Sequence, residues 1–277
     1  MKSFANKVAA ITGAGSGIGR ALALQLAEAG CHLALSDVNE DGLAETARQA
    51  AREGLRLTTA RVDVSKRDQV HAWAERAALD HGQVNLIFNN AGVAMGGTVA
   101  ETDYADYEWM MGINFWGVVH GTKAFLPLLK QAGEGHVINI SSVFGLMAQP
   151  TQSGYNAAKF AVRGFTESLR QELDLENCGV SATCVHPGGI KTNIARDARM
   201  SASAGKLLNS DAETARRNFE KLFRTTAGEA ASVILRGVRR DARRVLIGSD
   251  AVAIDALQRL APSGYQRLLK AGLRLMR

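Results

Sequence analysis

The sequence predicts an α/β protein built on one doubly wound, parallel sheet of about seven strands flanked by helices. Three observations favour this class. Short apolar runs alternate with longer segments of helical periodicity along most of the 277 residues, as crossovers between parallel strands require. A glycine-rich turn joins the first run to the first helix, and polar residues follow several of the other runs. With 46% hydrophobic residues, the chain can bury one large core or two small ones.

The first strand is the apolar run Lys7–Thr12, which has the composition of a strand buried on both faces. Gly13, Gly17 and Gly19 follow it, and the helix after them stops at Gly30. A glycine turn in this position lets the backbone approach a pyrophosphate, and the helix N-terminus attracts the anion. Because the spacing is GxxxGxG and not GxGxxG, a plain tight turn is the alternative.

The second strand, His32–Ser36, ends at Asp37, which lies 18 residues beyond Gly19. A carboxylate in this position can bind the adenosine ribose hydroxyls of a dinucleotide, and it repels a 2′-phosphate. Asp37 therefore favours NAD over NADP. The alternative for Asp37 is a cap on the helix that begins near Asn39. Arg20 follows Gly19 and could reach a phosphate, which keeps NADP as the second candidate cofactor.

The next two strand ends carry polar residues as well. We expect a helix over Asn39–Gly54, a strand over Leu55–Val62, a helix over Lys66–Gly82 and a strand over Val84–Phe88. Asp63 follows the third strand, and Asn89-Asn90-Ala91-Gly92 follows the fourth. Ligands bind beyond the carboxyl ends of parallel strands, where these residues should lie. The alternatives are a surface turn at Asp63 and asparagines that bond their own backbone.

A small flexible segment begins at Met95–Gly97, and one or two long helices span Tyr104–Gln131. Asn114 lies inside the apolar part of this helical region. A buried amide is costly unless it is hydrogen-bonded. Asn114 is therefore either a site residue that orders water or a neighbouring backbone, or a satisfied core amide.

The strongest chemical pattern follows the fifth strand, His136–Ser141. Ser142 comes directly after this strand, and the helix Gly154–Cys178 carries Tyr155 and Lys159. Residues four apart lie on one face of a helix. A phenol, an ammonium and a hydroxyl so placed can hold and protonate one carbonyl oxygen.

The sixth strand, Val180–His186, stops at a proline and two glycines, and a polar segment over about 190–226 follows as a candidate helical lid. A solvated helical insertion is the alternative for this segment. A helix over Ala227–Arg240 and a final short strand over Arg244–Gly248 complete the sheet.

The formal net charge of +6 comes from Gly228–Arg277, which holds ten Lys/Arg against four Asp/Glu. The tail, about 250–277, shows a basic amphipathic helical pattern broken at Pro262. We expect it to dock on its own core or on a partner subunit, and contact with an anionic membrane surface is the alternative. Nucleic acid is not expected as a partner, because no aromatic stacking platform accompanies the charge.

The three cysteines form no CxxC pair and have no metal-like spacing with histidine, so we expect reduced thiols and no metal. The apolar run at the N-terminus is shorter than a signal peptide needs, so none is expected, and no stretch approaches the roughly 18 apolar residues of a membrane span. These features predict a cytoplasmic protein with a single domain over residues 1–277.

Six motifs together resemble the short-chain dehydrogenase/reductase family over about residues 5–195. They are, in order, Thr12-Gly13-x-x-x-Gly17-x-Gly19, Asn89-Asn90-Ala91-Gly92, Asn114, Ser142 thirteen residues before Tyr155, Tyr155-x-x-x-Lys159, and Pro187-Gly188 followed by Thr192. The resemblance implies a Rossmann-type fold and a tetrad in which Tyr155 is the general acid/base and Ser142 holds the substrate oxygen. Lys159 would bind the nicotinamide ribose and lower the phenol pKa, and Asn114 would support a water-linked proton path.

The resemblance also implies which residues bind the cofactor. They are Gly13, Ser16, Gly17, Ile18, Gly19, Asp37, Asp63, Val64, Asn90, Ala91, Gly92, Tyr155, Lys159, Pro187, Gly188, Ile190 and Thr192. Among them, Asp63 and Val64 would flank the adenine, and Ile190 and Thr192 would hold the carboxamide. Many tetrameric members of the family stop after a glycine-rich final strand. The basic tail puts that tetramer in doubt, so the expected homo-oligomer is a dimer or a tetramer.

We therefore expect an NAD(H)-dependent oxidoreductase that acts on a secondary alcohol or ketone. Its pocket, placed by order along the chain, comprises Gly96, Val143, Phe144, Leu146, Met147, Gln149, Asn193 and Ile194. These residues are mainly apolar, which indicates an apolar or bulky substrate. The alternatives are an NADP(H)-dependent carbonyl reductase and a non-catalytic nucleotide-binding sensor or scaffold. The intact tetrad argues against the sensor.

Overall fold

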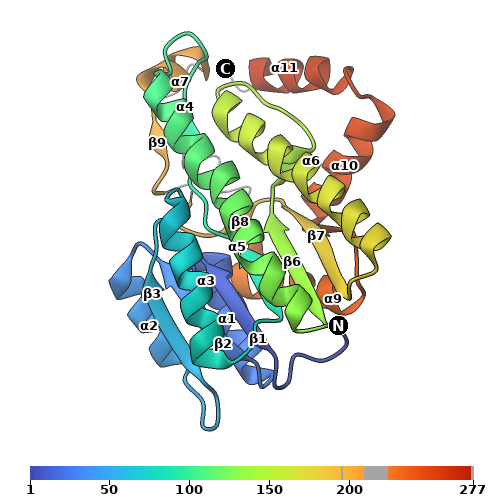
Figure 1. Ribbon diagram of the computed structural model, residues 1–277. Coiled ribbons are helices and arrows are strands. Elements are labelled where there is room, and N and C mark those ends of the chain that lie inside the picture. The colour runs from blue at the N-terminus through green and yellow to red at the C-terminus, as the bar shows by residue number, and fades with distance from the viewer. Residues whose placement is uncertain (195, 209–223, 276–277) are drawn as a thin grey trace.

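A computed structural model describes residues 1–194, 196–208 and 224–275 of the chain (Figure 1). Its centre is a seven-stranded sheet in the order β11-β7-β6-β4-β1-β2-β3, in which every neighbouring pair is parallel. The strands are β1 Val8–Thr12, β2 His32–Asp37, β3 Leu57–Arg61, β4 Leu86–Asn89, β6 Gly135–Ile140, β7 Val180–Pro187 and β11 Arg244–Ile247. The strand order reverses between β1 and β4, which creates a crevice at their carboxyl ends. The predicted doubly wound sheet is confirmed.

Helices cover both faces of this sheet. They are α1 Gly17–Glu28, α2 Glu40–Ala50, α3 Arg67–His81, α4 Tyr104–Met111, α5 Gly117–Gln131, α6 Ser153–Glu176 and α9 Ala227–Arg239. Buried side chains of α1, α2 and α9 form one core with the sheet, and those of α3, α5 and α6 form the other. The two cores together make the three-layer α/β architecture that the alternating sequence pattern predicts.

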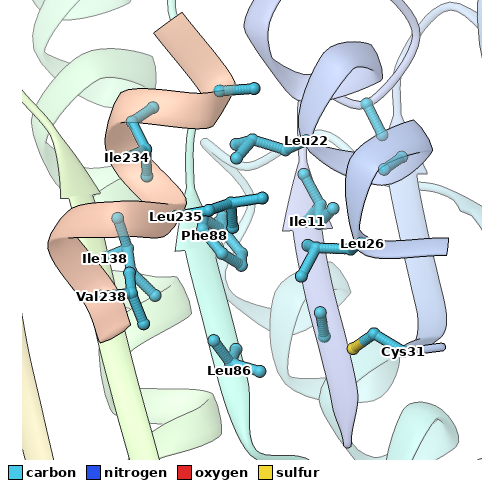
Figure 2. Close-up of a cluster of buried hydrophobic side chains, with 14 of the residues drawn as sticks. Ile11, Leu22, Leu26, Cys31, Leu86, Phe88, Ile138, Ile234, Leu235 and Val238 are labelled. Atoms are coloured by element: carbon cyan, nitrogen blue, oxygen red, sulfur yellow. The ribbon is translucent and has the colours of Figure 1, made fainter. Parts of the chain in front are cut away.

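The strands divide their side chains between the two cores by simple alternation. In β1, Ala9 and Ile11 belong to the core under α1 and α9, whereas Val8 and Ala10 belong to the opposite one. Figure 2 shows the first core, where side chains of α1 and α9 meet over β1, β4 and β6. Because both faces are buried, the central strands appear in the sequence as mainly apolar runs, whereas β3 at the sheet edge is partly exposed and more polar.

Two pairs of very short strands depart from the predictions. The segment at Met95–Gly97, expected to be flexible, contains β5 Met95–Gly96, which pairs in parallel with β9 Arg199–Met200. Likewise, β8 Ile190–Lys191 pairs with β10 Thr225–Thr226. Within the predicted lid, 190–226, the β8–β10 pair therefore joins the two ends of the segment to each other, whereas β9 anchors it to β5 outside the segment. Helix α7 Ala202–Leu208 follows β9. Residues 195 and 209–223 of the predicted lid lie outside the described residues.

The region predicted as one or two long helices is interrupted at its centre. A π-helical turn, η1 Gly112–Trp116, separates α4 from α5. The extra residue in such a turn shifts the helical face, and turns of this kind are frequent at functional sites. Asn114 lies within η1.

The tail forms two helices, α10 Ser249–Leu260 and α11 Tyr265–Leu275, and the break between them includes Pro262. Asp255 on α10 pairs with Arg244 of β11, which ties the tail to the sheet edge. No helix in the described ranges has the length and apolar character needed to cross a membrane.

Candidate active site

The glycine turn after β1 is built so that no side chain fits inside it. Gly13 has φ +66°, and a Cβ there would lie 2.8 Å from the Cα of Ala91. A Cβ on Gly19 would overlap the carbonyl oxygen of Gly13. The turn and the segment after β4 therefore pack backbone against backbone, and only glycine satisfies these two positions.

Two side chains join the glycine turn to the segment after β4. The Thr12 hydroxyl oxygen accepts hydrogen bonds from the backbone N–H groups of Asn90 at 2.9 Å and Ala91 at 3.0 Å. The Asn90 amide donates to the carbonyls of Thr12 at 2.9 Å and Gly13 at 3.1 Å. Asn90 thus bonds the neighbouring strand end and not its own turn. The contribution of Thr12 was missed, although its position at the strand end was the available signal.

The N-terminus of α1 is open to an anion. Ser16 precedes the helix with an exposed side chain that caps no N–H group, and the first turn contains no acidic residue. A helix N-terminus with free N–H groups favours phosphate. Together with the side-chain-free turn around Gly13 and Gly19, this arrangement fits the pyrophosphate of a dinucleotide.

Asp37 lies at the end of β2, beside the glycine turn. Its Oδ2 accepts the Gly15 N–H at 2.8 Å, and its Oδ1 accepts the Asn39 N–H at 2.9 Å. The side chain that caps α2 is that of Asn39, which accepts the Gly42 N–H at 3.0 Å. Asp37 therefore anchors the glycine turn and is not the helix cap. Gly15 was missed as a site residue, and a Cβ on it would lie 2.8 Å from the Asp37 carboxylate.

The structure brings Ser142, Tyr155 and Lys159 together at the carboxyl end of β6. Ser142 begins the short 3₁₀ turn η2 Val143–Gly145, and its hydroxyl oxygen accepts the Phe144 N–H at 3.1 Å. Lys159 lies one turn beyond Tyr155 on α6, with its Nζ 5.6 Å from the centre of the phenol ring. The Lys159 ammonium donates to the Ile140 carbonyl at 3.0 Å.

Burial shifts the pKa values of both ionisable groups toward their neutral forms. Burial raises the pKa of Tyr155 to about 12, and a hydrogen bond with the Ser142 side chain lowers it by a smaller amount. Burial also lowers the pKa of Lys159 to about 8. The expected lowering of the phenol pKa by Lys159 is thus absent in the chain alone. Removal from water outweighs the attraction of an ammonium that faces the Ile140 carbonyl.

Asn114 is fully buried and orders a neighbouring segment of backbone. Its Oδ1 accepts the Val93 N–H and its Nδ2 donates to the Val93 carbonyl, both at 2.8 Å. A Cβ on Gly92 would lie 3.2 Å from the Asn114 Oδ1 and 3.6 Å from the Lys159 Nζ. Gly92 therefore lies close to both Asn114 and Lys159, and a side chain there would be tight against the Asn114 amide. The water-linked proton path stays a prediction.

The turn after β7 approaches the glycine turn from the other side of the crevice. Thr192 lies against the helix start, since a Cβ on Gly17 would lie 3.1 Å from its Cγ2. Pro187 ends β7, and Ile190 is buried in the core under α1. The Gly188 N–H donates to the Ile247 carbonyl at 2.9 Å. The predicted residues on this turn are thus fixed at the crevice.

Asp63 and Val64, the residues predicted to flank the adenine, make contacts within the protein itself. The Asp63 carboxylate accepts the N–H of Ser65 at 2.9 Å and its hydroxyl at 2.7 Å, so it stabilises its own turn. Val64 is buried in the core under α3 and α5. Adenine contact at these two positions stays a prediction.

The predicted substrate residues occupy different environments. Val143, Leu146 and Met147 are buried, Phe144 meets the Tyr155 ring edge-on at 6.1 Å, and Met200 covers Gly96. Ile194 is half-buried, Asn193 is exposed, and the Gln149 carbonyl accepts the Asn156 amide at 3.0 Å.

A small apolar cluster around Tyr155 was missed. It comprises Val93, Met95, Trp109, Met110, Met111, Tyr155 and Ala158. These residues come from three separate segments, so no local pattern in the sequence identifies the cluster as a group.

Comparisons with known proteins agree with this fold. The short chain dehydrogenase family matches residues 7–202. A putative oxidoreductase SadH from Mycobacterium tuberculosis is 49% identical, covering 99% of this chain and 97% of that protein. Estradiol 17-beta-dehydrogenase 11 from Macaca fascicularis is 30% identical, covering 97% of this chain and 84% of that protein.

A solved structure shows the same architecture. A short chain dehydrogenase/reductase from Burkholderia phymatum, in complex with NAD, superposes with a TM-score of 0.86 at 32% identity, covering 95% of this chain and 96% of that one. The chain therefore belongs to the short-chain dehydrogenase/reductase family of oxidoreductases. The family and the NAD-complexed neighbour support a nicotinamide cofactor.

Proposed function

We propose that this protein is an NAD(H)-dependent dehydrogenase that interconverts an apolar secondary alcohol and its ketone. The observation that carries the proposal is the convergence of Ser142, Tyr155 and Lys159 at the strand ends, opposite a glycine turn anchored by Asp37. When bound, the nicotinamide supplies or accepts the hydride. The protein's own residues must hold the carbonyl oxygen and move the proton.

In reduction, the Tyr155 hydroxyl donates its proton to the carbonyl oxygen, which the Ser142 hydroxyl also holds by a hydrogen bond. In oxidation, the same phenol oxygen takes the proton back from the alcohol. Lys159 would bind the cofactor ribose through its ammonium, and its positive charge would favour the phenolate form against the larger opposing effect of burial. Asn114 fixes Val93 beside Lys159 and so keeps this side of the site rigid.

Two charged residues favour NAD over NADP. The Asp37 carboxylate stands where a 2′-phosphate would need a cation. Arg20 is the nearest candidate for such a cation, but its guanidinium donates to the carbonyls of Gly15 and Gly42 and to the Thr46 hydroxyl. Binding a phosphate would require Arg20 to leave these partners.

The surroundings of Tyr155 favour an apolar substrate. Phe144, Met95 and Met110 pack near the phenol, and the relatives include a protein named as an estradiol dehydrogenase. A bulky ketone gains free energy from such a surface because its own apolar area leaves water. The choice among steroid-like, aryl and aliphatic ketones is left to a substrate panel.

We also propose a cytoplasmic homo-oligomer, on two observations. The cysteines are unpaired, and Cys31 and Cys184 are buried. Trp116 on η1 is 51% exposed and Phe160 on α6 is also exposed. Exposed large aromatic residues of this kind are enriched at subunit interfaces.

The test is NADH consumption with a panel of aryl, steroid-like and aliphatic ketones. Tyr155→Phe should lower kcat by about 10²–10⁴-fold while NADH affinity changes little. Tyr104→Phe is the matched control, because Tyr104 is 89% exposed and far less enclosed than Tyr155. If no ketone or alcohol is turned over while NADH still binds, the non-catalytic sensor replaces this proposal.

A further inference from the structure

The C-terminal tail touches the candidate active site at two separate points. Asp250, at the start of α10, accepts the Gly189 N–H at 2.7 Å. Tyr265, at the start of α11, accepts the Ala148 N–H on its hydroxyl oxygen at 3.2 Å. Gly189 belongs to the turn after β7, and Ala148 belongs to the loop that leads from Ser142 to α6. The tail thus contacts both the turn that carries predicted cofactor residues and the loop that carries predicted substrate residues.

The contact at Asp250 leaves no spare room. A Cβ on either Gly188 or Gly248 would overlap the Asp250 carboxylate. Gly248 has φ +94°, a conformation that side-chain-bearing residues rarely adopt. The chain therefore turns sharply from β11 into α10. The Asp250 carboxylate lies directly against the turn after β7 as a result.

The contact at Tyr265 fixes a loop that carries predicted pocket residues. Tyr265 is only 6% exposed, although its neighbours Gln266 and Arg267 are exposed. Leu146 and Met147, which precede Ala148, are buried, and the carbonyl of the following Gln149 bonds to Asn156 on α6. Without the Tyr265 hydroxyl, the Ala148 N–H would lose the acceptor that the fold gives it, at a cost comparable to one hydrogen bond.

We propose that Tyr265 is a positioning residue for the loop Val143–Gln149, which carries predicted pocket residues. By holding Ala148, Tyr265 sets how firmly this loop presents its apolar side chains to the substrate. The assignment rests on the proposed function, since it names a residue that controls substrate affinity. Figure 1 shows α11 at the same end of the molecule as α7, which follows the strand pair at Gly96.

The experiment compares Tyr265→Phe with the exposed control Tyr104→Phe in the full chain. Loss of one hydrogen bond should raise the KM for the best ketone by about threefold to tenfold. The kcat and the affinity for NADH should stay within about twofold, because Tyr265 touches neither Tyr155 nor the glycine turn. Amide hydrogen exchange of a peptide that contains Ala148 should become faster in Tyr265→Phe and stay unchanged in Tyr104→Phe.

Two results would overturn the assignment. One is an unchanged KM together with unchanged exchange near Ala148. The other is a parallel loss of kcat, ketone affinity, NADH affinity and thermal stability, which would show a general structural role. If the wild type turns over no substrate, the proposed function fails, whereas exchange near Ala148 still decides whether Tyr265 holds the loop.

Discussion

The most informative perturbation is at Asp37, because its carboxylate has two separable roles. Its charge opposes a 2′-phosphate, and its two oxygens accept the N–H groups of Gly15 and Asn39. Asp37→Asn removes the charge and keeps one acceptor. Asp37→Ala removes both the charge and the acceptors, so the pair of variants distinguishes cofactor choice from anchoring of the glycine turn.

The magnitude follows from the charge and its surroundings. Two like unit charges about 4 Å apart repel by about 4 kcal/mol at an effective dielectric constant of about 20, and by about 1 kcal/mol in bulk water. Asp37 is half-buried, so the repulsion between its carboxylate and a 2′-phosphate lies between these limits, at about 2–3 kcal/mol. Because 1.4 kcal/mol is a tenfold change, the wild type should prefer NADH over NADPH by about 30-fold to 150-fold.

The assay is titration of each protein with NADH and NADPH by calorimetry or intrinsic fluorescence. Asp37→Asn should reduce the preference for NADH over NADPH to below about tenfold, chiefly by improving NADPH binding. Asp37→Ala should also weaken NADH, because Gly15 and Asn39 each lose an acceptor. The control is Asp41→Asn, an exposed carboxylate in the first turn of α2. Equal or tighter NADPH binding by the wild type would refute the reasoning, as would an unchanged preference in Asp37→Asn.

Three further predictions concern the lysine, the glycine turn and the subunit interface. Burial lowers the pKa of Lys159 from its ordinary value of 10.5 to about 8 in the folded protein. Between pH 8 and pH 10.5 the unfolded chain therefore binds more protons than the folded chain does. The unfolding free energy of the wild type should therefore rise over this range by up to about 3 kcal/mol relative to Lys159→Met, as chemical denaturation at several pH values would show. Gly19→Ala should abolish measurable NADH binding in the same titrations, because the alanine methyl group would overlap the Gly13 carbonyl. An NADH affinity within about threefold of the wild type would contradict this packing argument. Trp116→Lys should dissociate the proposed oligomer in light scattering, whereas Leu79→Lys, on an exposed position of α3, should not.

The sheet and the proximity of Ser142, Tyr155 and Lys159 were predictable because their signals are local. Each buried strand is a continuous apolar run, and the residues that follow the strands meet at one edge by the rules of parallel sheets. Tyr155 and Lys159 share a helix, so their spacing alone places them on one face. The strand boundaries differ by only a residue or two, as at Leu57–Arg61 against the expected Leu55–Val62.

Contacts between distant segments gave no such signal. The pairs β5–β9 and β8–β10 are two residues long, too short for a period of two to appear in the sequence. Tyr265 and Ala148 are separated by 117 positions, and nothing near either residue predicts that they meet. The tail was expected to dock on its own core or on a partner subunit, and the structure shows it docked on its own core; which loops it contacts there could not be predicted.

The ionisation of the site depends on the same long-range packing. Apolar residues from separate segments surround Tyr155 and raise the pKa of its phenol to about 12, a shift that the spacing of Tyr155 and Lys159 does not reveal. A phenol that stays protonated at neutral pH can donate a proton but cannot accept one. On the proposed function, the apolar surroundings of Tyr155 should therefore also favour reduction near neutral pH. Oxidation requires the phenolate, so its rate should rise more steeply with pH than the rate of reduction, and parallel pH profiles for the two directions would contradict this account.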